Sequence, residues 1–408
     1  MLRALSTGVT GLRTNQEALD VIGNNIANIN TTGFKGSRAE FADLLSQTLT
    51  GEQAPTTSLG GRDAAQIGLG TRLASVQTNF TQGTIQSTDN STDLAIQGDG
   101  LFALKSGANT YYSRAGSFTL DANGTLVDSV SGYKVQGTAG DITIAPGSTQ
   151  AASATTQAVF GGNLDASQVD GTQYVSTFGV NDSLGVPHTL TLTFTKNFAG
   201  ASGRWDWAAT EADANISGLT TATGQLVFGT GGSISSGASQ AIGITYAAAA
   251  GVTTPQAVTL DFGSATNTTK MTGYAGTSTA ALTSQDGYAS GTLQAFAIGA
   301  DGSVTGNYSN GRSATLAQVQ LANFANPTGL VRVGDNMFRV SQNSGPAEVG
   351  APGSGGRGTL IAGALESSNV DLAREFTELI THQRGFEASA RVIRAGDEVL
   401  QTVVNIKQ

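Results

Sequence analysis

The chain contains no cysteine. A disulfide-bonded scaffold and a thiolate metal site are therefore excluded. Charged residues are also scarce, at 12% of 408 residues, and the net charge is −9. Proteins that bind nucleic acids usually carry clustered lysine and arginine to contact phosphate, and this acidic chain shows no such cluster. Composition thus argues against nucleic acid as a partner.

Long apolar runs are missing as well. The N-terminal residues MLRALSTGVT hold no apolar core of the length that a secretory signal requires. The best apolar stretch, Ile244 to Val252, is short and rich in alanine, and it falls well below the roughly 18 residues of a membrane-spanning helix. On these features alone, we expect a cytoplasmic protein.

Aromatic residues make up only 6% of the chain, whereas glycine occurs 55 times. This profile is typical of strands joined by many tight turns. The stretch TLTLTFT at 189–195 alternates so that Leu190, Leu192 and Phe194 share one face of a strand. Asn-Gly and Asp-Gly pairs separate such runs and favour turns, because glycine accepts a positive φ. The pattern predicts a β-rich centre.

The two ends of the chain carry a different pattern, with apolar residues at every seventh position. The N-terminal set is Leu5, Leu12, Leu19 and Ile26, with Leu2 and Val9 offset from them. The C-terminal set is Leu372, Leu379, Phe386, Ile393 and Leu400, flanked by Phe376, Ala390 and Val404. An amphipathic helix packed on a globular core would explain either set alone. Two matched sets favour pairing of the two helices with each other.

Pairing of the ends would require the chain to leave the helices, fold outward and return. We therefore predict a multidomain α+β protein with paired N- and C-terminal heptad helices and two nested, discontinuous all-β domains. The terminal helical, coiled-coil domain would comprise 1–70 with 363–408. The inner β domain would comprise 71–141 with 286–362, and the outer β domain 142–285.

Residues suited to catalysis or metal binding are sparse. The two histidines, His188 and His382, lie on segments of different character, and a lone histidine is usually structural. The sequence has no GxSxG or HExxH pattern, and the glycine-rich Gly353–Thr359 lacks the lysine of a phosphate loop.

Two acidic patterns leave alternatives to consider. The stretch Asp89–Asp93 offers oxygens to calcium but lacks the glycine and the distant glutamate of an EF-hand loop, so a polar turn is favoured. Asp165, Asp170 and Asp182 could include a glycosidase pair, but their spacing singles out no two of them. We predict a protein that is not an enzyme, with no catalytic, cofactor-binding or metal-binding residues.

Three stretches carry a resemblance to a known family. They are GNNIANINTTGFK at Gly23–Lys35; QIGLGTRL from Gln66, continuing through FTQGTIQST and DLAIQGDGLF; and ALESSNVDLAREFTELITHQRGFEASARVI at Ala364–Ile393. All three resemble the axial proteins of the bacterial flagellar rod and hook. The central VSTFGVNDSLGVPHTLTLTFTK at Val175–Lys196, followed by WDW, is similar to the outer domain of the hook members of this family.

The resemblance implies a structural subunit of the flagellar hook, a flexible tube that acts as a universal joint and transmits torque from rod to filament. It implies an extracellular location reached by flagellar type III export without a cleaved signal peptide, contrary to the cytoplasmic expectation above. The implied partners are further copies of the chain in a helical homopolymer, the distal rod, the hook cap and the hook–filament junction proteins. Nucleic acid and membrane insertion are not implied.

Two alternatives remain open. One is a distal-rod or hook–filament junction protein of the same assembly. The other, from a different class, is a secreted adhesin or surface-layer protein, which would explain the Thr/Gly-rich centre but not the matched helices at both ends.

Taken together with the resemblance, the seven-residue spacing and the amide-rich stretch predict roles for particular residues. The polymerisation seam would comprise Leu5, Val9, Leu12, Leu19, Ile26, Leu372, Phe376, Leu379, Phe386, Ile393, Leu400 and Val404. The helix end of the family signature would comprise Asn24, Asn25, Asn28, Asn30, Gly33 and Phe34. Short amides bond backbone groups and tolerate left-handed φ, so they suit a helix end. They form either a plain cap and turn, or a cap that also bonds a neighbouring subunit.

Overall fold

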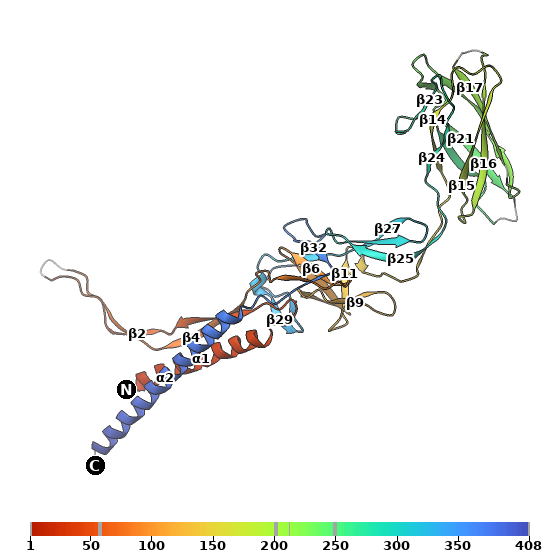
Figure 1. Cartoon of the computed structure of the whole chain (residues 1–408). Coiled ribbons are helices and arrows are strands. Elements are labelled where there is room, and N and C mark those ends of the chain that lie inside the picture. The colour runs from red at the N-terminus through yellow and green to blue at the C-terminus, as the bar shows by residue number, and fades with distance from the viewer. Residues whose placement is uncertain (1, 56–58, 200–202, 212, 248–250, 407–408) are drawn as a thin grey trace. The chain divides into compact units, whose positions relative to one another are not determined.

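The computed structural model describes residues 2–55, 59–199, 203–211, 213–247 and 251–406. The chain divides into two compact units. Unit 1 comprises Met1–Ala145, Phe296–Gly306 and Ala314–Gln408, and unit 2 comprises Pro146–Ala295 and Asn307–Ser313. Long helices lie at the two ends of the chain, and mostly strands lie between them (Figure 1). The predicted terminal helices and β-rich centre are thus confirmed.

Helix α1 (Leu2–Ala27) and helix α2 (Leu372–Ile406) lie side by side in unit 1 (Figure 1). The two helices run in opposite directions: Asn15 Oδ1 lies 3.0 Å from His382 Nδ1, whereas Gly8, nearer the start of α1, faces Ile393, nearer the end of α2. Glycines allow this close approach. A Cβ placed on Gly396 would lie 2.8 Å from the Leu5 side chain.

Helix α1 also packs against a small antiparallel sheet of β1 (Ser37–Asp43) and β4 (Thr71–Thr78). The Thr14 and Thr71 hydroxyls lie 3.2 Å apart at this contact. Strands β2 (Ser46–Thr50) and β3 (Ala65–Gly68) form a second antiparallel pair, and every residue of both is exposed.

The rest of unit 1 centres on a ten-stranded sheet whose main path is β29-β30-β8-β7-β11-β10-β9. These strands are β29 (Val331–Gly334), β30 (Met337–Arg339), β8 (Asn109–Ser113), β7 (Leu101–Ser106), β11 (Lys134–Gly137), β10 (Leu126–Asp128) and β9 (Phe118–Leu120). Off the path lie β12 (Gly140–Asp141), β28 (Leu321–Asn323) and β31 (Glu348–Gly350), and a 3-10 turn, η2, covers Pro327–Gly329.

Two further antiparallel pairs bring the two halves of unit 1 together. Strand β6 (Leu94–Gln97) pairs with β32 (Thr359–Ala362), and β5 (Ile85–Ser87) pairs with β33 (Ala364–Glu366). Leu94 and Ile96 of β6 and Phe102 of β7 are fully buried. Residues 367–371 connect β33 to α2, so this pairing lies close to the start of α2.

Unit 2 is a sandwich of two sheets (Figure 1). The first contains β18 (Ile216–Thr220), β21 (Ser239–Tyr246), β22 (Gln256–Asp261), β14 (Gln157–Asn163) and β23 (Met271–Thr272), with β24 (Ala281–Gln285) paired to β14. The second contains β15 (Gln173–Asn181), β16 (Pro187–Lys196), β17 (Arg204–Glu211), β19 (Thr223–Phe228) and β20 (Ile234–Ser236). A separate four-stranded sheet, which is not part of the sandwich, has the order β13 (Thr149–Gln150), β25 (Gly291–Ile298), β26 (Ser303–Tyr308) and β27 (Ser313–Gln318).

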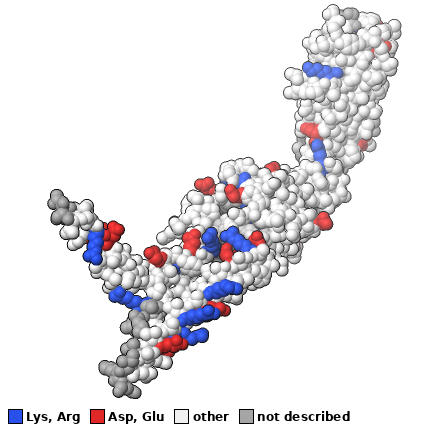
Figure 2. Space-filling view, turned by 60° about the vertical axis from the view of Figure 1, so that its left-hand side comes forward, with Lys and Arg blue, Asp and Glu red and all other residues white. Residues whose placement is uncertain are grey.

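The two sheets of unit 2 share one aromatic core. Phe160 of β14 meets Phe178 of β15 with ring centres 5.2 Å apart. Leu190, Leu192 and Phe194 are all buried, which confirms the alternation predicted for β16. The side chains that form this core are apolar or aromatic. Little charge appears on the face of unit 2 visible in Figure 2, whereas charges gather over unit 1.

Within the described residues, neither helix is long and apolar enough to cross a membrane.

Candidate functional site

The end of α1, the loop that follows it, the start of β1, the end of β33 and the start of α2 meet at one place in unit 1, here called the junction. Helix α1 ends at Ala27, and Asn28 closes it, because its side chain donates to the Asn24 carbonyl at 2.9 Å. Thr31 then donates to the Asn28 side chain at 3.1 Å. Asn24 and Asn30 are exposed.

Asn25 is the amide that ties three elements together. It is 2% exposed, donates to the Ser37 carbonyl at 2.7 Å and accepts from the Ser37 N–H at 2.9 Å. Its amide nitrogen also lies 3.2 Å from both carboxylate oxygens of Glu375 in α2. Burial raises the pKa of Glu375, although the Asn25 bond opposes this. One side chain of α1 thus positions both β1 and α2.

Gly33 and Phe34 insert the loop into the body of unit 1. Gly33 has φ +66°, and a Cβ there would lie 2.5 Å from the Ala115 nitrogen, so only glycine fits without movement. Its N–H donates to the Glu366 carbonyl at 2.7 Å. Phe34 is buried, and the Arg332 guanidinium lies 4.9 Å from the centre of its ring.

A buried charge cluster lies directly beside this loop. Lys35 Nζ lies 2.6 Å from one Glu366 carboxylate oxygen, and Arg114 Nε lies 2.5 Å from the other. All three side chains are at least 96% buried. The remaining Arg114 nitrogens donate to the carbonyls of Gly100, Ile96 and Gly98. Each charged group of the cluster therefore has an oppositely charged partner and further hydrogen bonds, which is the condition for tolerating buried charge.

Burial and pairing shift the pKa values of this cluster. Burial lowers the pKa of Lys35 more than the Glu366 bond raises it. Burial alone would raise the pKa of Glu366, but the Arg114 charge and hydrogen bonds from Lys35, Arg114 and the Gly83 N–H outweigh it and lower the pKa. Glu366 is thus held as a carboxylate that joins the loop to β33.

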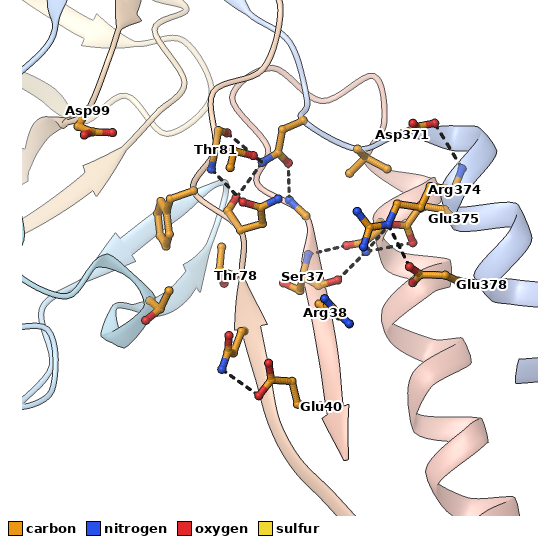
Figure 3. Close-up of a pocket in the computed structure, with 18 residues that line it drawn as sticks. Ser37, Arg38, Glu40, Thr78, Thr81, Asp99, Asp371, Arg374, Glu375 and Glu378 are labelled. Carbon is orange, nitrogen blue, oxygen red and sulfur yellow. Dashed lines mark hydrogen bonds and ion pairs between the residues drawn. The ribbon is translucent and has the colours of Figure 1, made fainter. Parts of the chain in front are cut away.

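A cavity of about 600 Å³ opens beside the junction, between β1, β4 and the first turns of α2 (Figure 3). Its lining includes Asn25, Glu40, Asp371, Arg374 and Glu378. Asp371 begins α2 by accepting the Ala373 N–H at 2.9 Å, and Arg374 pairs with Glu378 at 3.1 Å. These groups are ordinary helix-start and surface contacts.

Other polar residues singled out in the sequence hold turns. Asp165 accepts the N–H groups of Ser167 and Gly276, and Asp170 accepts that of Phe198. Asp93, the last residue of the 89–93 stretch, accepts a hydrogen bond from the preceding Thr88 hydroxyl at 2.7 Å. In the part of the chain that the structure describes, no group of three His, Asp or Glu residues is arranged to hold a metal ion.

The residues of the predicted seam fall into two groups. Half-buried positions are Leu5, Leu12, Leu19, Ile26, Leu379, Phe386, Ile393 and Leu400. Exposed positions are Val9 at 53%, Leu372 at 41% and Phe376 at 48%. The Val404 side chain lies outside the described residues. The face of α1 that is buried within the chain is a different one and includes Thr14, Ala18, Ile22 and Asn25.

The sequence analysis did not identify four residues of the junction: Glu366, Arg114, Arg332 and Asn369. Asn369 accepts the Gly36 N–H at 2.8 Å and donates to the Asn79 carbonyl at 2.8 Å. Two features of the sequence could have drawn attention to the charge cluster: Lys35 is the only lysine before residue 105, and Glu366 belongs to the third family motif. The pairing partners lie far apart in the sequence, so only the fold brings them together.

Family models match four parts of the chain: Flagella basal body rod protein at 5–35, Flagellar hook protein FlgE/F/G D1 domain at 95–158, Flagellar basal body protein FlaE D2 domain at 148–288, and Flagellar basal body rod FlgEFG protein C-terminal at 361–406. The first and last of these matches contain the residues that meet at the junction from either end of the chain.

Individual relatives match the whole chain. The flagellar hook protein FlgE of Treponema pallidum is 37% identical, with all of both chains covered. The flagellar basal-body rod protein FlgG of Bacillus subtilis is 31% identical, again with full coverage of both. The crystal structure of Helicobacter pylori flagellar hook protein FlgE2 has a similar fold, with a TM-score of 0.55 and 12% identity over 69% of this chain and 100% of that one. The chain therefore belongs to the flagellar hook protein family.

Proposed function

We propose that this chain is the structural subunit that polymerises into the bacterial flagellar hook, a flexible tube that transmits torque from rod to filament. The observation that carries the proposal is the exposure of α2. None of the described side chains of this 35-residue helix is buried within the chain. A helix that covers so little of its apolar surface within its own chain gains most of its stability from contacts made elsewhere.

The exposed apolar residues of α2 follow a helical spacing. Leu372, Phe376 and Ile380 are four residues apart and 41%, 48% and 51% exposed. Such a spacing places them on one face of the helix. We call these three residues the outer face of α2. In the proposed tube, the outer face packs against the terminal helices of neighbouring copies, while the half-buried seam residues hold α1 to α2 as a coiled coil.

The same proposal assigns domains and partners. In the proposed hook, the terminal helical domain of 1–70 with 363–408 forms the inner tube. The inner β domain of 71–141 with 286–362 is inserted between the two terminal segments in the sequence. The outer β domain of 142–285 is in turn inserted within the inner β domain. Besides copies of itself, the partners are the distal rod, the hook cap and the hook–filament junction proteins. The proposed route of the chain to the extracellular flagellum is the type III export apparatus.

A distal-rod subunit is the second candidate, because a rod protein is 31% identical over the full chain. Hook relatives from Treponema pallidum and Borreliella burgdorferi are 37% and 36% identical over the full chain, which favours the hook. A cell that lacks its own hook gene and receives this chain distinguishes the two. Hook complementation restores a curved external structure, whereas a rod subunit leaves the cell without one.

Purified protein provides the direct test of polymerisation. Electron microscopy of a concentrated sample should show tubes, and Phe376→Asp should abolish them, because a charge buried in an apolar contact costs several kcal/mol. Thr381→Asp is the matched control, since Thr381 is exposed on the same helix outside the outer face. The thermal unfolding of both variants should match the parent chain in dilute solution. Normal tubes from Phe376→Asp would contradict the proposal.

A further inference from the structure

Unit 2 contains a buried histidine that the proposed function does not use. His188 lies at the start of β16 and is 2% exposed. Its Nδ1 lies 2.6 Å from an oxygen of Asp213, and its Nε2 lies 3.2 Å from an oxygen of Asp182. The Tyr246 ring covers it with ring centres 4.9 Å apart. The described titratable groups in contact with His188 are therefore two carboxyls and one phenol.

The hydrogen bonds around His188 depend on how many protons its ring carries. An ionised carboxylate accepts hydrogen bonds and cannot donate them, and a neutral imidazole carries only one N–H. Both ring nitrogens can donate at once only in the imidazolium form. The Asn215 N–H and the His188 ring lower the pKa of Asp213, so that carboxyl is ionised at neutral pH. Burial, aided by the two carboxylates, raises the pKa of Tyr246 to about 12, so the phenol stays neutral.

Asp182 connects the histidine to a tight turn. Its other carboxylate oxygen accepts the N–H groups of Leu184 at 2.9 Å and Val186 at 2.8 Å. Gly185 in this turn has φ +84°, and a Cβ there would lie 2.6 Å from the Ala152 side chain and 2.9 Å from the Ala289 backbone. The turn at 182–186 therefore presses against both segments that carry the chain into and out of the sandwich.

A polar network continues from the turn into the same two segments. Thr155, on the entering segment, exchanges two hydrogen bonds with Asn181, and its hydroxyl donates to Gln285 on the leaving segment at 2.7 Å. Gln256 donates to the carbonyls of Thr155 and Asn181 and accepts from the Tyr246 hydroxyl at 2.6 Å. These contacts link the His188 environment to residues 152–156 and 285–290.

We propose that protonated His188 is a positioning residue that clamps the 182–186 turn across the two connecting segments and makes them a rigid part of unit 2. When the imidazolium loses a proton, one of its two hydrogen bonds is lost, and two carboxylates face each other without a cation between them. The clamp then loosens, and residues 152–156 and 285–290 gain freedom. The device thus ties the stiffness of these segments to pH. This inference concerns a single chain and does not depend on polymerisation.

The first test needs no mutation. Nitrogen NMR of the histidine rings in the dilute, full-length chain should show protons on both His188 nitrogens at neutral pH. The chain has only two histidines, so His382→Gln assigns the signals. A single ring proton on His188 in the folded chain at neutral pH would overturn the proposal.

The second test measures the clamp itself by hydrogen exchange of the backbone amides in 152–156 and 285–290. His188→Gln should speed this exchange about ten- to hundredfold near neutral pH. This factor corresponds to the free energy of one charge-assisted hydrogen bond. The ratio of variant to parent should fall toward one as rising pH removes the second ring proton, because the parent chain then lacks the same hydrogen bond as the variant. A purely structural role would leave the ratio independent of pH, and that result would refute the clamp.

Two further variants complete the test. Asp213→Asn keeps the shape of a partly exposed partner while removing its charge, and it should produce the same pH-dependent change with a smaller amplitude. Glu211→Gln is the control, because Glu211 is an exposed carboxylate on the adjoining strand end, and it should exchange like the parent. Equal acceleration by Glu211→Gln would show that any loss of negative charge loosens the segments.

Discussion

The sandwich of unit 2 and the helix junction of unit 1 are stabilised in opposite ways. In the sandwich, Phe160, Phe194 and Phe262 are fully buried in one continuous core. At the junction, the best buried side chains are polar: Asn25, Lys35 and Glu366. The described side chains of α2, in contrast, are all at least partly exposed. The sandwich is thus built around a large apolar core, whereas specific polar contacts place the helices, and apolar side chains of α2 stay exposed.

The largest expected effect tests the core of the sandwich. Trp207 is 2% exposed, so Trp207→Ala should lower the free energy of unfolding of unit 2 by about 3–5 kcal/mol. Leu379 of α2 is only half-buried. Leu379→Ala should therefore lower the free energy of unfolding of the dilute chain by about 1 kcal/mol or less, while it weakens polymerisation. Denaturant unfolding and sedimentation of polymer measure the two effects. Similar losses of monomer stability from both variants would remove the contrast between the two regions.

The second effect concerns the charge cluster. Glu366→Gln leaves Lys35 and Arg114 buried without their counterion, so unit 1 should lose about 3–4 kcal/mol of unfolding free energy. Glu378→Gln is the control, since the Arg374–Glu378 pair is exposed at 62% and 37% and such pairs are worth about 0–1 kcal/mol. A small loss from Glu366→Gln would show that the cluster is dispensable.

The same carboxylate predicts a dependence on pH. The pKa of Glu366 is lower in the folded than in the unfolded chain. Its stabilising contribution is therefore fully present above the ordinary glutamate pKa and is lost as pH falls through the lowered folded value. Acid titration of unit 1 stability should show this loss in the parent chain and a smaller loss in Glu366→Gln. Identical acid profiles would mean that other carboxylates cause the acid sensitivity.

The sequence predicted the regular parts of this structure better than the junction. The alternation around Leu190 and the seven-residue spacing through Leu379 identify a strand and a helix because each pattern repeats locally. The spacing did not identify which face of α1 is buried, since Thr14 and Asn25 are polar and lie on that face. The cluster of Lys35 with Glu366 joins residues 331 positions apart, and no local pattern encodes such a contact.

The third effect tests the backbone at the junction. Gly33→Ala should destabilise unit 1 by about 2 kcal/mol or more, because alanine resists positive φ and its Cβ would clash with the Ala115 backbone. Gly23→Ala is the matched control within the same family motif. A Cβ on Gly23 meets nothing within 4 Å, so alanine in this helix should stabilise it by about 0.5–1 kcal/mol. Thermal unfolding followed by circular dichroism measures both, and a destabilising Gly23→Ala would contradict the open space beside Gly23 in the single chain.

The smallest expected effect separates two neighbouring amides. Asn25→Ala removes the partner of both backbone groups of Ser37 and one contact to Glu375, so unit 1 should lose about 1–2 kcal/mol. Asn24 is exposed, and its side chain accepts a hydrogen bond from the Asn28 side chain at 3.2 Å, so Asn24→Ala should change monomer stability by about 0.5 kcal/mol or less. The critical concentration for polymerisation then decides what the exposed amide does. If Asn24→Ala raises that concentration while monomer stability is unchanged, Asn24 bonds a neighbouring copy. If both quantities match the parent chain, the amide cluster acts within one subunit through Asn25 and Asn28, and the helix end is a cap and turn alone.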